Sequence, residues 1–503
     1  MKKFRFSRLT LKNNWFVAIL FAALVFITKS PFFSLPTFWD EQNYIGGTLK
    51  VIHNNLNPFV EFYAYKPPLV FLLTATCYKI FGEFLVIPRI IIAVFSCLTL
   101  WFLFLLGKRL FDEEVGFFSA IILFFSPLFF AQSGLFTASI PFTALTIATV
   151  YFFTKDNRPA YTISASLLLL TKETGLLLIA SLILSEILYL FCIKSGLKSF
   201  KTSLARILHL SLALIPFMSW MLANKLMLGW YLWPLHTAPF KHFSPSLWLL
   251  GQICKNTFWR DYRFFFVLSL LAALIISLRN KSLREHIFTK TFLVFIILSF
   301  ITISFFLSKG AGELHGPNAR YFMAIQALLF LFGTASIYAL IKRRLLTRII
   351  LASICILMVI AWFPPSKDYI WWEKDLNLRY IDSLAAHKTA IDFLKDNFSR
   401  PLILANAPLD EELTEPRIGY LKYPFTRVLT IGNTFDPENP SKTIQPRLIP
   451  QDRQILILIE NSYSTPLLPF ARKKADIIAV FKSGPVRVML FSLDVDKLHL
   501  RNH

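Results

Sequence analysis

The stretch FLVIPRIIIAVFSCLTLWFLFLLG (84–107) decides the fold class, because it is almost entirely apolar. A helix of about 20 apolar residues is long enough to cross the hydrocarbon core of a bilayer. Similar runs recur over most of the chain, and we expect spans at 14–31, 84–107, 115–131, 136–154, 158–171, 173–193, 204–226, 263–278, 290–308, 320–341 and 347–364. The sequence therefore predicts a polytopic α-helical membrane protein.

The composition of the whole chain supports this fold class. Of the 503 residues, 55% are hydrophobic and 17% are charged, whereas soluble domains are about 45–50% apolar and about 25% charged. The net charge of +23 would suit a nucleic-acid partner, but Lys and Arg fall mainly in short loops between apolar runs. There they set the topology and meet anionic headgroups, so we expect membrane lipids and no nucleic acid. The five cysteines show neither metal-ligand spacing nor a disulfide framework.

Five short basic loops indicate the orientation of the chain in the membrane: 108–114, 155–158, 194–201, 279–290 and 342–348. Two spans separate each loop from the next, so all five can lie in the cytoplasm together with the N-terminus. This arrangement holds if the apolar piece 68–82 lies at the surface; the alternative is that it crosses the membrane. We then expect a plasma-membrane or inner-membrane protein whose extracytoplasmic side receives 32–83, 132–135, 171–173, 227–262, 309–319 and everything after 364.

The character of the sequence changes after Pro364. A helix is expected over 385–397, and strands are expected at 401–408, 427–433, 454–461, 475–481 and 486–493. We therefore divide the chain into a membrane domain, 1–365, and a small extracytoplasmic α/β domain, 366–503. The α/β domain contains neither a glycine-rich phosphate loop nor a nucleophile elbow, so no chemistry is assigned to it.

An adjacent pair of carboxylates, Asp40 and Glu41, directly follows the first span, in FWDEQNYIGG (38–47). A capping box in which Thr37 caps a helix and Asp40 reaches back would explain Asp40 alone. Consecutive acids point about 100° apart on a helix, which suits a division of labour. One carboxylate would deprotonate an acceptor hydroxyl, and the other would orient a partner or bind a cation. No second acidic cluster completes a hard-cation site, so no metal ligand is assigned, and a divalent cation stays an alternative.

Three cations are expected on the same outer face: Lys66 in YAYKPPL (63–69), Lys172 in LLTKETG (169–175) and Arg320 in GAGELHGPNARYF (310–322). Arg320 opens a helix, and the helix dipole prefers anions at that end. Either its side chain snorkels to headgroups, or an anionic ligand lies beside it. Three cations on one face indicate a phosphate or pyrophosphate, carried on a lipid.

Three neighbours of these cations are further candidates for substrate binding, namely Glu173, His315 and Tyr321. His315 lies in a glycine-rich loop, where the alternative is a solvated histidine without a ligand.

The order of these motifs resembles that of a known family. This order is similar to that of membrane glycosyltransferases of the GT-C fold: an acid pair follows the first span, then come K-P-P-L and L-T-K-E-T-G, and A-R-Y-F opens a late span. The resemblance covers roughly 14–365 and is greatest to the protein O-mannosyltransferase and aminoarabinose-transferase superfamily, glycosyltransferase family 39-like or 83-like. It implies about 11–13 membrane helices and an active site at the outer surface. It also implies inverting transfer of a sugar from a polyprenyl-phosphate or dolichyl-phosphate carrier, without a nucleotide sugar.

The resemblance also implies roles for the residues quoted above. Asp40 would be the general base that activates the acceptor hydroxyl, and Glu41 would help to position the acceptor. Lys66, Lys172 and Arg320 would hold the carrier phosphate as it leaves. The acceptor would be a protein, a lipid or a glycan.

The sequence departs from the family pattern at two places. In LFTASIPF (135–142), Ala138 and Ser139 stand where relatives often carry an acid, and Tyr65 stands where the aminoarabinose branch has an acid before the lysine. These departures argue against the zinc site of that branch. The alternative functions are a transporter or flippase of lipid-linked glycans and a non-catalytic assembly protein, but the charges expected at one rim favour a transferase.

Overall fold

A computed structural model describes the chain over the residue ranges 13–61, 65–192, 197–234, 246–309, 318–341, 343–364, 371–398, 401–431, 454–461 and 466–494. The chain divides into two compact units. Unit 1 comprises 1–33, 46–82 and 87–362, and unit 2 comprises 34–45, 83–86 and 363–503. Each unit is described by itself.

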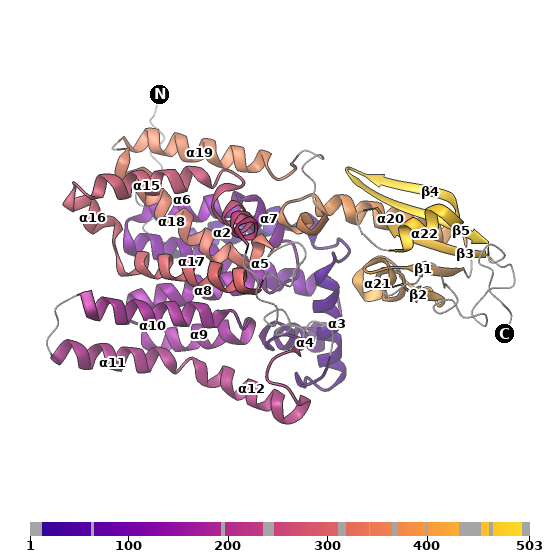
Figure 1. The fold of residues 1–503 in the computed structure, drawn as a ribbon, viewed down its shortest axis with the longest axis horizontal. Helices are drawn as coiled ribbons and strands as arrows, with labels where there is room; N and C mark the ends of the chain where they lie inside the picture. Colours follow the sequence, from indigo (N-terminus) through magenta and orange to yellow (C-terminus); the bar gives the residue numbers. More distant parts are fainter. Residues whose placement is uncertain are drawn as a thin grey trace. The chain divides into compact units, whose positions relative to one another are not determined.

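Unit 1 is a bundle of helices that follow the expected spans (Figure 1). The helices are α2 (Asn14–Lys29), α4 (Leu69–Phe81), α5 (Val86–Leu110), α6 (Glu113–Phe125), α7 (Pro127–Gln132), α8 (Ser139–Lys155), α9 (Arg158–Thr171), α10 (Gly175–Cys192), α11 (Leu197–Ser211), α12 (Leu214–Leu228), α14 (Leu247–Cys254), α15 (Phe264–Ser277), α16 (Lys281–Ile287), α17 (Lys290–Lys309), α18 (Met323–Leu340) and α19 (Arg344–Ile360). Short turns η1 (Ser30–Phe32), η3 (Lys255–Trp259) and η5 (Ala319–Phe322) join some of them. Within the described residues, five helices are long and apolar enough to cross a membrane, as expected for a multi-pass membrane protein.

Proline divides two of the expected spans. The span expected at 115–131 breaks into α6 and α7 because Ser126, which precedes Pro127, adopts an extended backbone with ψ of 134°. The span expected at 204–226 bends between α11 and α12, at residues 212–213. Pro216 explains this bend, because its ring would clash with the carbonyl of residue 212 in a continuous helix. The piece expected at 68–82 forms helix α4, and whether it crosses the membrane stays a prediction.

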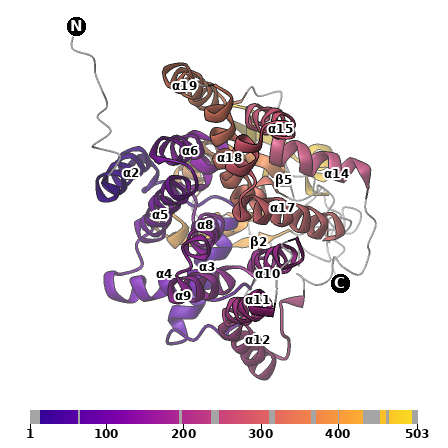
Figure 2. The same cartoon turned by 90° about the vertical axis from the view of Figure 1, so that its left-hand side faces the viewer.

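Helix α18 lies at the centre of unit 1. Every residue from Met323 to Ile337 is buried, and Figure 2 shows α18 among α6, α8, α15 and α17. Glycines permit the closest contacts: a Cβ on Gly333 would lie 2.5 Å from the Cβ of Phe266. Between α5 and α6, a Cβ on Gly107 would lie 2.5 Å from the Cα of Gly116. Small residues at such crossings let helix backbones approach closely, which is how membrane helices gain packing energy.

Four of the five basic loops lie at one end of unit 1. Glu114 of the first loop accepts from Arg344 at 2.8 Å and from Arg348 at 2.9 Å, both from the last loop. Residues of the loops 108–114, 155–158 and 279–290 line one shared cavity. The side chains of the fifth loop, 194–201, lie outside the described residues. This grouping is the one expected if the loops share a membrane face, and which face that is stays a prediction.

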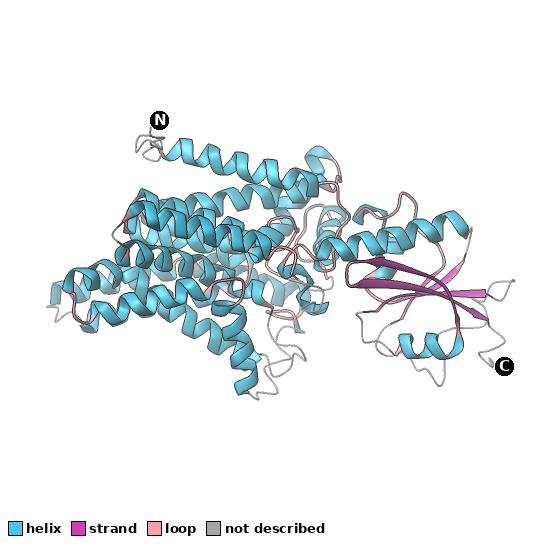
Figure 3. Ribbon diagram, turned by 90° about the horizontal axis from the view of Figure 1, so that it is seen from above, coloured by secondary structure: helices cyan, strands magenta, loops and turns pink. Residues whose placement is uncertain are grey.

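Unit 2 is an α/β unit built on a five-stranded sheet of order β2-β1-β3-β5-β4 (Figure 3). Strand β1 pairs in parallel with β2 and β3, and β5 pairs antiparallel with β3 and β4. The elements are η7 (Trp371–Leu376), α20 (Tyr380–Asn397), β1 (Leu402–Ala405), α21 (Leu409–Thr414), η8 (Pro416–Ile418), β2 (Val428–Thr430), β3 (Gln454–Glu460), α22 (Leu467–Lys474), β4 (Asp476–Ser483) and β5 (Val486–Asp494). The expected helix and all five expected strands are therefore present.

The sheet of unit 2 carries apolar side chains on both faces of β3. Ile455, Ile457 and Ile459 belong to a core that also contains Leu467 and Phe470 of α22. The alternate residues of β3 are buried as well, and α20 contacts β4 and β5. Figure 3 shows a long helix and a short helix on opposite faces of the sheet. Alternation along the strand explains why both faces need a covering helix.

Candidate functional site

The acidic pair lies at the start of helix α3 (Asp40–His53), in the part that belongs to unit 2. Glu41 is fully buried and its Oε2 accepts a hydrogen bond from the backbone N–H of Phe38 at 2.7 Å. Asp40 is partly exposed at the first residue of the helix. The expected capping box of Thr37 and Asp40 is therefore wrong, since Glu41 makes the reciprocal bond of a capping box.

A backbone reversal explains why the cap lies one residue later than expected. Trp39 has a φ of 43°, so the helix starts after it, and Glu41 is the third residue after Phe38. The backbone N–H of Thr37 donates instead to the carbonyl of Ile418 at 2.9 Å. Positive φ in a bulky residue is rare, and the sequence gives no signal for it.

Behind this helix start lies a buried chain of polar groups in unit 2. Gln42 Nε2 donates to Glu412 Oε1 at 3.1 Å, and His387 Nδ1 lies 2.8 Å from Glu412 Oε2. His387 Nε2 lies 2.9 Å from Glu460 Oε2, and Lys374 pairs with the other oxygen of Glu460. Each of the five residues is at most 4% exposed. We call these five residues the buried relay.

The charged groups of the buried relay shift one another's pKa values. Burial alone would lower the pKa of His387, but Glu412 and Glu460 outweigh burial and raise it to about 9. Burial would raise the pKa of Glu460, but Lys374 and His387 lower it to about 2. At neutral pH His387 is therefore an imidazolium that donates to a side-chain oxygen of Glu412 and of Glu460. Burial raises the pKa of Glu412 and lowers the pKa of Lys374, and the opposite charges within the relay counter both shifts.

The sequence contained one indirect signal for the buried relay. His387 lies four residues before Ile391 and seven before Leu394, and therefore on the apolar face of α20. A histidine there requires a buried partner, but its partners come from 412 and 460 and are not identifiable from spacing.

In unit 1 the structure brings together Lys172, Arg320 and Tyr321. Lys172 Nζ lies 4.1 Å from the centroid of the Tyr321 ring, and the Arg320 Cζ lies 5.6 Å from it. Both distances are within the range of a cation–π interaction. Phe306 of α17 stacks on Tyr321 at 5.1 Å between centroids, which holds the ring in place. We call Lys172, Arg320 and Tyr321 together the Tyr321 cluster.

Local structure fixes both cations of the Tyr321 cluster. Lys172 follows the last residue of α9 and has an extended backbone, with φ of −158°, and Glu173 is the next residue of this turn. Arg320 lies in η5, where the Asn318 side chain accepts from the Arg320 backbone N–H at 3.0 Å. His315 lies outside the described residues.

Lys66 is positioned by different elements of unit 1. Its neighbour Tyr65 is 2% exposed, and the Tyr65 hydroxyl oxygen lies 2.9 Å from both the Pro58 carbonyl and Asn224 Oδ1. The Tyr65 ring also packs edge-on against Trp230, with 4.8 Å between centroids. Tyr65 thus fixes the segment that carries Lys66.

The Tyr321 cluster borders a small apolar cavity of about 20 Å³, which also touches Phe142, Thr174 and Phe306. This is about the space of one water molecule. Within the described residues, no group of three or more His, Cys, Asp or Glu side chains has the arrangement of a metal site.

Part of the chain is similar in sequence to a known family. Residues 65–222 match the family model described as dolichyl-phosphate-mannose-protein mannosyltransferase. This segment contains Lys66, Lys172 and Glu173. A search of curated protein sequences found no match.

Solved structures match nearly the whole chain. The crystal structure of ArnT from Cupriavidus metallidurans in the apo state matches with a TM-score of 0.59 and 13% identity, over 96% of this chain and 99% of that one. The same protein bound to undecaprenyl phosphate matches with a TM-score of 0.58 and 13% identity, over 94% of this chain and 97% of that one. The Archaeoglobus fulgidus oligosaccharyltransferase in complex with zinc and sulfate matches with a TM-score of 0.54 and 13% identity, over 92% and 71%. Similarity at this identity shows a shared fold, and it confirms the expected GT-C fold with a small C-terminal α/β part.

Proposed function

We propose that the protein is a membrane glycosyltransferase that moves a sugar from a polyprenyl-phosphate carrier to an acceptor hydroxyl on the extracytoplasmic face. The observation that carries this proposal is the Tyr321 cluster, in which Lys172 and Arg320 flank one tyrosine ring. Two cations beside one ring place positive charge at this site, and Lys and Arg form their strongest hydrogen bonds with anionic groups such as phosphate.

The Tyr321 cluster lies at the opposite end of the helices from the basic loops. Arg158 begins α9 and Lys172 follows its end; likewise Lys290 begins α17, and Phe306 near its other end stacks on Tyr321. If the basic loops are cytoplasmic, the cluster faces the extracytoplasmic side. The family model over 65–222 and the similarity to an enzyme solved with undecaprenyl phosphate support a lipid-linked phosphate as the anion.

In the proposed reaction, the acceptor oxygen attacks the anomeric carbon of the sugar from the face opposite the phosphate, so the configuration inverts. Asp40 accepts the proton of the acceptor hydroxyl, and the bond from the anomeric carbon to the phosphate oxygen breaks. The leaving polyprenyl phosphate gains negative charge, which Lys66, Lys172 and Arg320 stabilise. Because Glu41 is buried and caps the helix, its role is to position Asp40 rather than to touch the acceptor.

The test offers the purified full-length protein a panel of polyprenyl-phosphate sugars with peptide, lipid and glycan acceptors, followed by mass spectrometry of the products. Asp40→Asn should lower the transfer rate by about 10²–10⁴-fold, the range for loss of a general base. Lys172→Gln should lower kcat, because the charge that develops on the leaving phosphate loses one of its stabilising cations, and it should also raise the KM for the carrier. Asp396→Asn, an exposed carboxylate of unit 2, is the matched control and should transfer normally.

Two results would contradict this proposal. Undiminished transfer by Asp40→Asn would remove Asp40 from the role of base. Movement of an intact lipid-linked glycan across proteoliposomes, without transfer to any acceptor, would show a flippase instead.

A further inference from the structure

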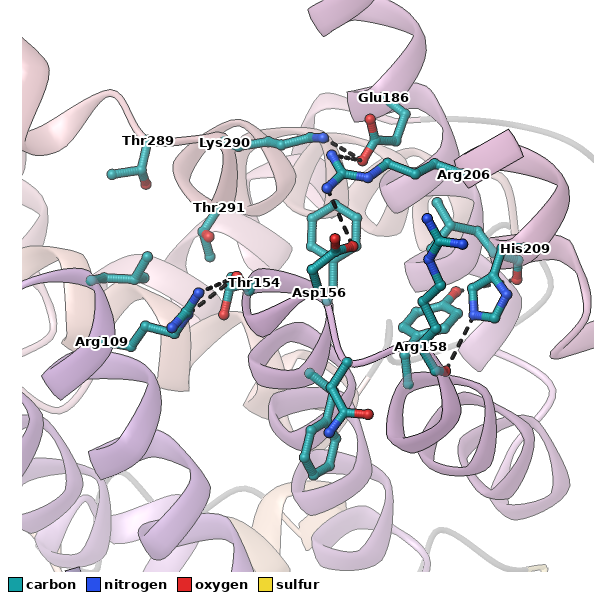
Figure 4. Close-up of a pocket in the computed structure, with 16 residues that line it drawn as sticks. Arg109, Thr154, Asp156, Arg158, Glu186, Arg206, His209, Thr289, Lys290 and Thr291 are labelled. Atoms are coloured by element: carbon teal, nitrogen blue, oxygen red, sulfur yellow. Dashed lines mark hydrogen bonds and ion pairs between the residues drawn. The ribbon is translucent and has the colours of Figure 1, made fainter. Parts of the chain in front are cut away.

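A cavity of about 440 Å³ lies at the end of unit 1 where the basic loops meet (Figure 4). Its walls come from the end of α5, the junction of α8 and α9, the helices α10 and α11, and the start of α17. A cavity of this size is in the range of small-molecule sites, about 300–1,000 Å³. The proposed transfer reaction does not use it.

The lining of this cavity carries an excess of positive charge. Four cations line it, Arg109, Arg158, Arg206 and Lys290, whereas Asp156 and Glu186 are the carboxylates among the lining residues that the structure describes. His209 also lines the cavity, and its Nε2 lies 3.2 Å from the carbonyl oxygen of Arg158. We call this cavity the arginine pocket.

Ion pairs within the arginine pocket involve only part of this charge. Figure 4 shows Lys290 and Arg206 meeting at Glu186, which is 1% exposed. Arg206 also reaches Asp156, with 3.2 Å between Nη2 and Oδ1. Arg109 donates from Nε and Nη2 to the Thr154 carbonyl at 3.1 Å and 2.9 Å. Because a carbonyl is neutral, the charge of Arg109 is not offset by this contact.

Helix dipoles do not change this balance. Helices α9 and α17 begin at the arginine pocket, and their N-terminal ends are positive. Helices α5 and α8 end there, and their C-terminal ends are negative. The two effects offset each other, so the excess positive charge resides on the side chains, chiefly on Arg109 and on the exposed Arg158.

The rest of the lining indicates the shape of the ligand. Thr289 and Thr291 supply hydroxyl groups, and Leu110, Phe152 and Phe153 supply an apolar wall. Guanidinium groups bind phosphate oxygens in pairs of parallel hydrogen bonds, which is why arginine is the preferred partner of phosphate. The cavity is larger than inorganic phosphate, and the apolar wall suits an organic part attached to the phosphate.

We propose that the arginine pocket binds the phosphate group of an organic phosphate, with Arg109 and Arg158 as its main contacts. The two sources of such a group are an anionic phospholipid headgroup and a soluble phosphate ester. The site is distinct from the one proposed for the sugar carrier, because Lys172 lies at the other end of α9 from Arg158. The proposal for the arginine pocket is therefore independent of the proposed transfer reaction.

The test measures saturable binding to the purified full-length protein in a neutral detergent. The probes are short-chain phosphatidylglycerol, glycerol 3-phosphate and, as the zwitterionic control, short-chain phosphatidylcholine. The variant Arg158→Gln should weaken binding of the anionic probe about tenfold, the effect of one charge-assisted contact. Arg284→Gln removes an exposed arginine of the same basic loop as Lys290 and is the matched control, with unchanged binding.

The results separate the two sources and include a refutation. Binding of phosphatidylglycerol alone assigns the pocket to a lipid headgroup, and binding of glycerol 3-phosphate assigns it to a soluble ester. No saturable binding of either anionic probe by the unmodified protein refutes the proposal. Equal weakening by Arg158→Gln and Arg284→Gln refutes it as well, because it would show a diffuse effect of net charge. Arg109→Gln, measured in the same way, provides a second variant should Arg158→Gln not fold.

Discussion

Replacing His387 by Gln should destabilise unit 2, because this imidazolium separates the buried carboxylates of Glu412 and Glu460. Gln has similar polarity but carries no charge, so the two anions would face each other through a neutral group. Loss of one partner from a buried ion pair costs about 3–5 kcal/mol, since the remaining charge is left uncompensated.

The pKa of His387 gives a second measure of the same contribution. A rise from the ordinary value of 6.5 to about 9 corresponds to about 3 kcal/mol at 1.36 kcal/mol per unit. A group whose pKa is raised on folding contributes its full stabilisation below the unfolded pKa. This stabilisation is therefore complete below about pH 6.5 and is lost as the pH rises to about 9.

The assay is thermal unfolding of the full-length protein in detergent between pH 6 and pH 10. The melting temperature of the unmodified protein should fall over pH 6.5–9 as His387 loses its proton. His387→Gln should melt lower at pH 6, and its difference from the unmodified protein should close above about pH 9. The matched control is Lys395→Gln, which removes an exposed cation from the same helix α20 and should change stability by less than about 1 kcal/mol.

A double variant tests the physical reason. His387→Gln combined with Glu412→Gln removes one cation and one anion together, so its loss should be smaller than the sum of the two single losses. An equal difference between His387→Gln and the unmodified protein at pH 6 and at pH 10 would refute the reasoning, because the charge of His387 would then not matter. Unchanged melting of His387→Gln at pH 6 would refute it as well.

Two further predictions concern the helix cap and the helix packing. Glu41→Gln keeps an oxygen that can accept from the Phe38 N–H, so it should retain transfer activity and stability. Glu41→Ala should lower the free energy of unfolding by about 1–2 kcal/mol. Abolished transfer in Glu41→Gln at normal stability would instead make Glu41 a catalytic group. Gly333→Ala places a Cβ 2.5 Å from the Cβ of Phe266 and should lower stability by about 1–3 kcal/mol. Thermal unfolding measures this loss. A melting temperature equal to that of the unmodified protein would contradict the prediction and show that α15 can move aside at no cost.

The sequence predicts the helices of unit 1 and the strands of unit 2 well because both depend on local patterns. A run of apolar residues has the length of a membrane span, and alternation within a short segment identifies a strand. The breaks at Pro127 and Pro216 also have a local cause, the proline ring, but the expected spans did not take these prolines into account. Most expected elements therefore end within a few residues of the observed ones, but the short helices α14, α16, α21 and α22 are missed.

The candidate site is less predictable because its geometry depends on distant residues. Tyr65 is held by Asn224 and Trp230, and His387 is held by Glu412 and Glu460. Nothing in the spacing of these residues indicates the pairing. The exchange of roles between Asp40 and Glu41 at the helix cap follows from one backbone angle at Trp39, which the sequence does not reveal.

The composition of unit 2 has a consequence for dissecting the protein. The unit needs residues 34–45, which lie more than 300 positions before its main segment. The Tyr420 hydroxyl donates to the carbonyl of Thr37 at 3.2 Å, and Gln42 donates to Glu412. A fragment that starts at Phe363 would lose both of these buried hydrogen bonds. A soluble version for crystallisation or binding studies therefore requires the peptide 34–45, either supplied separately or joined to the fragment by a linker.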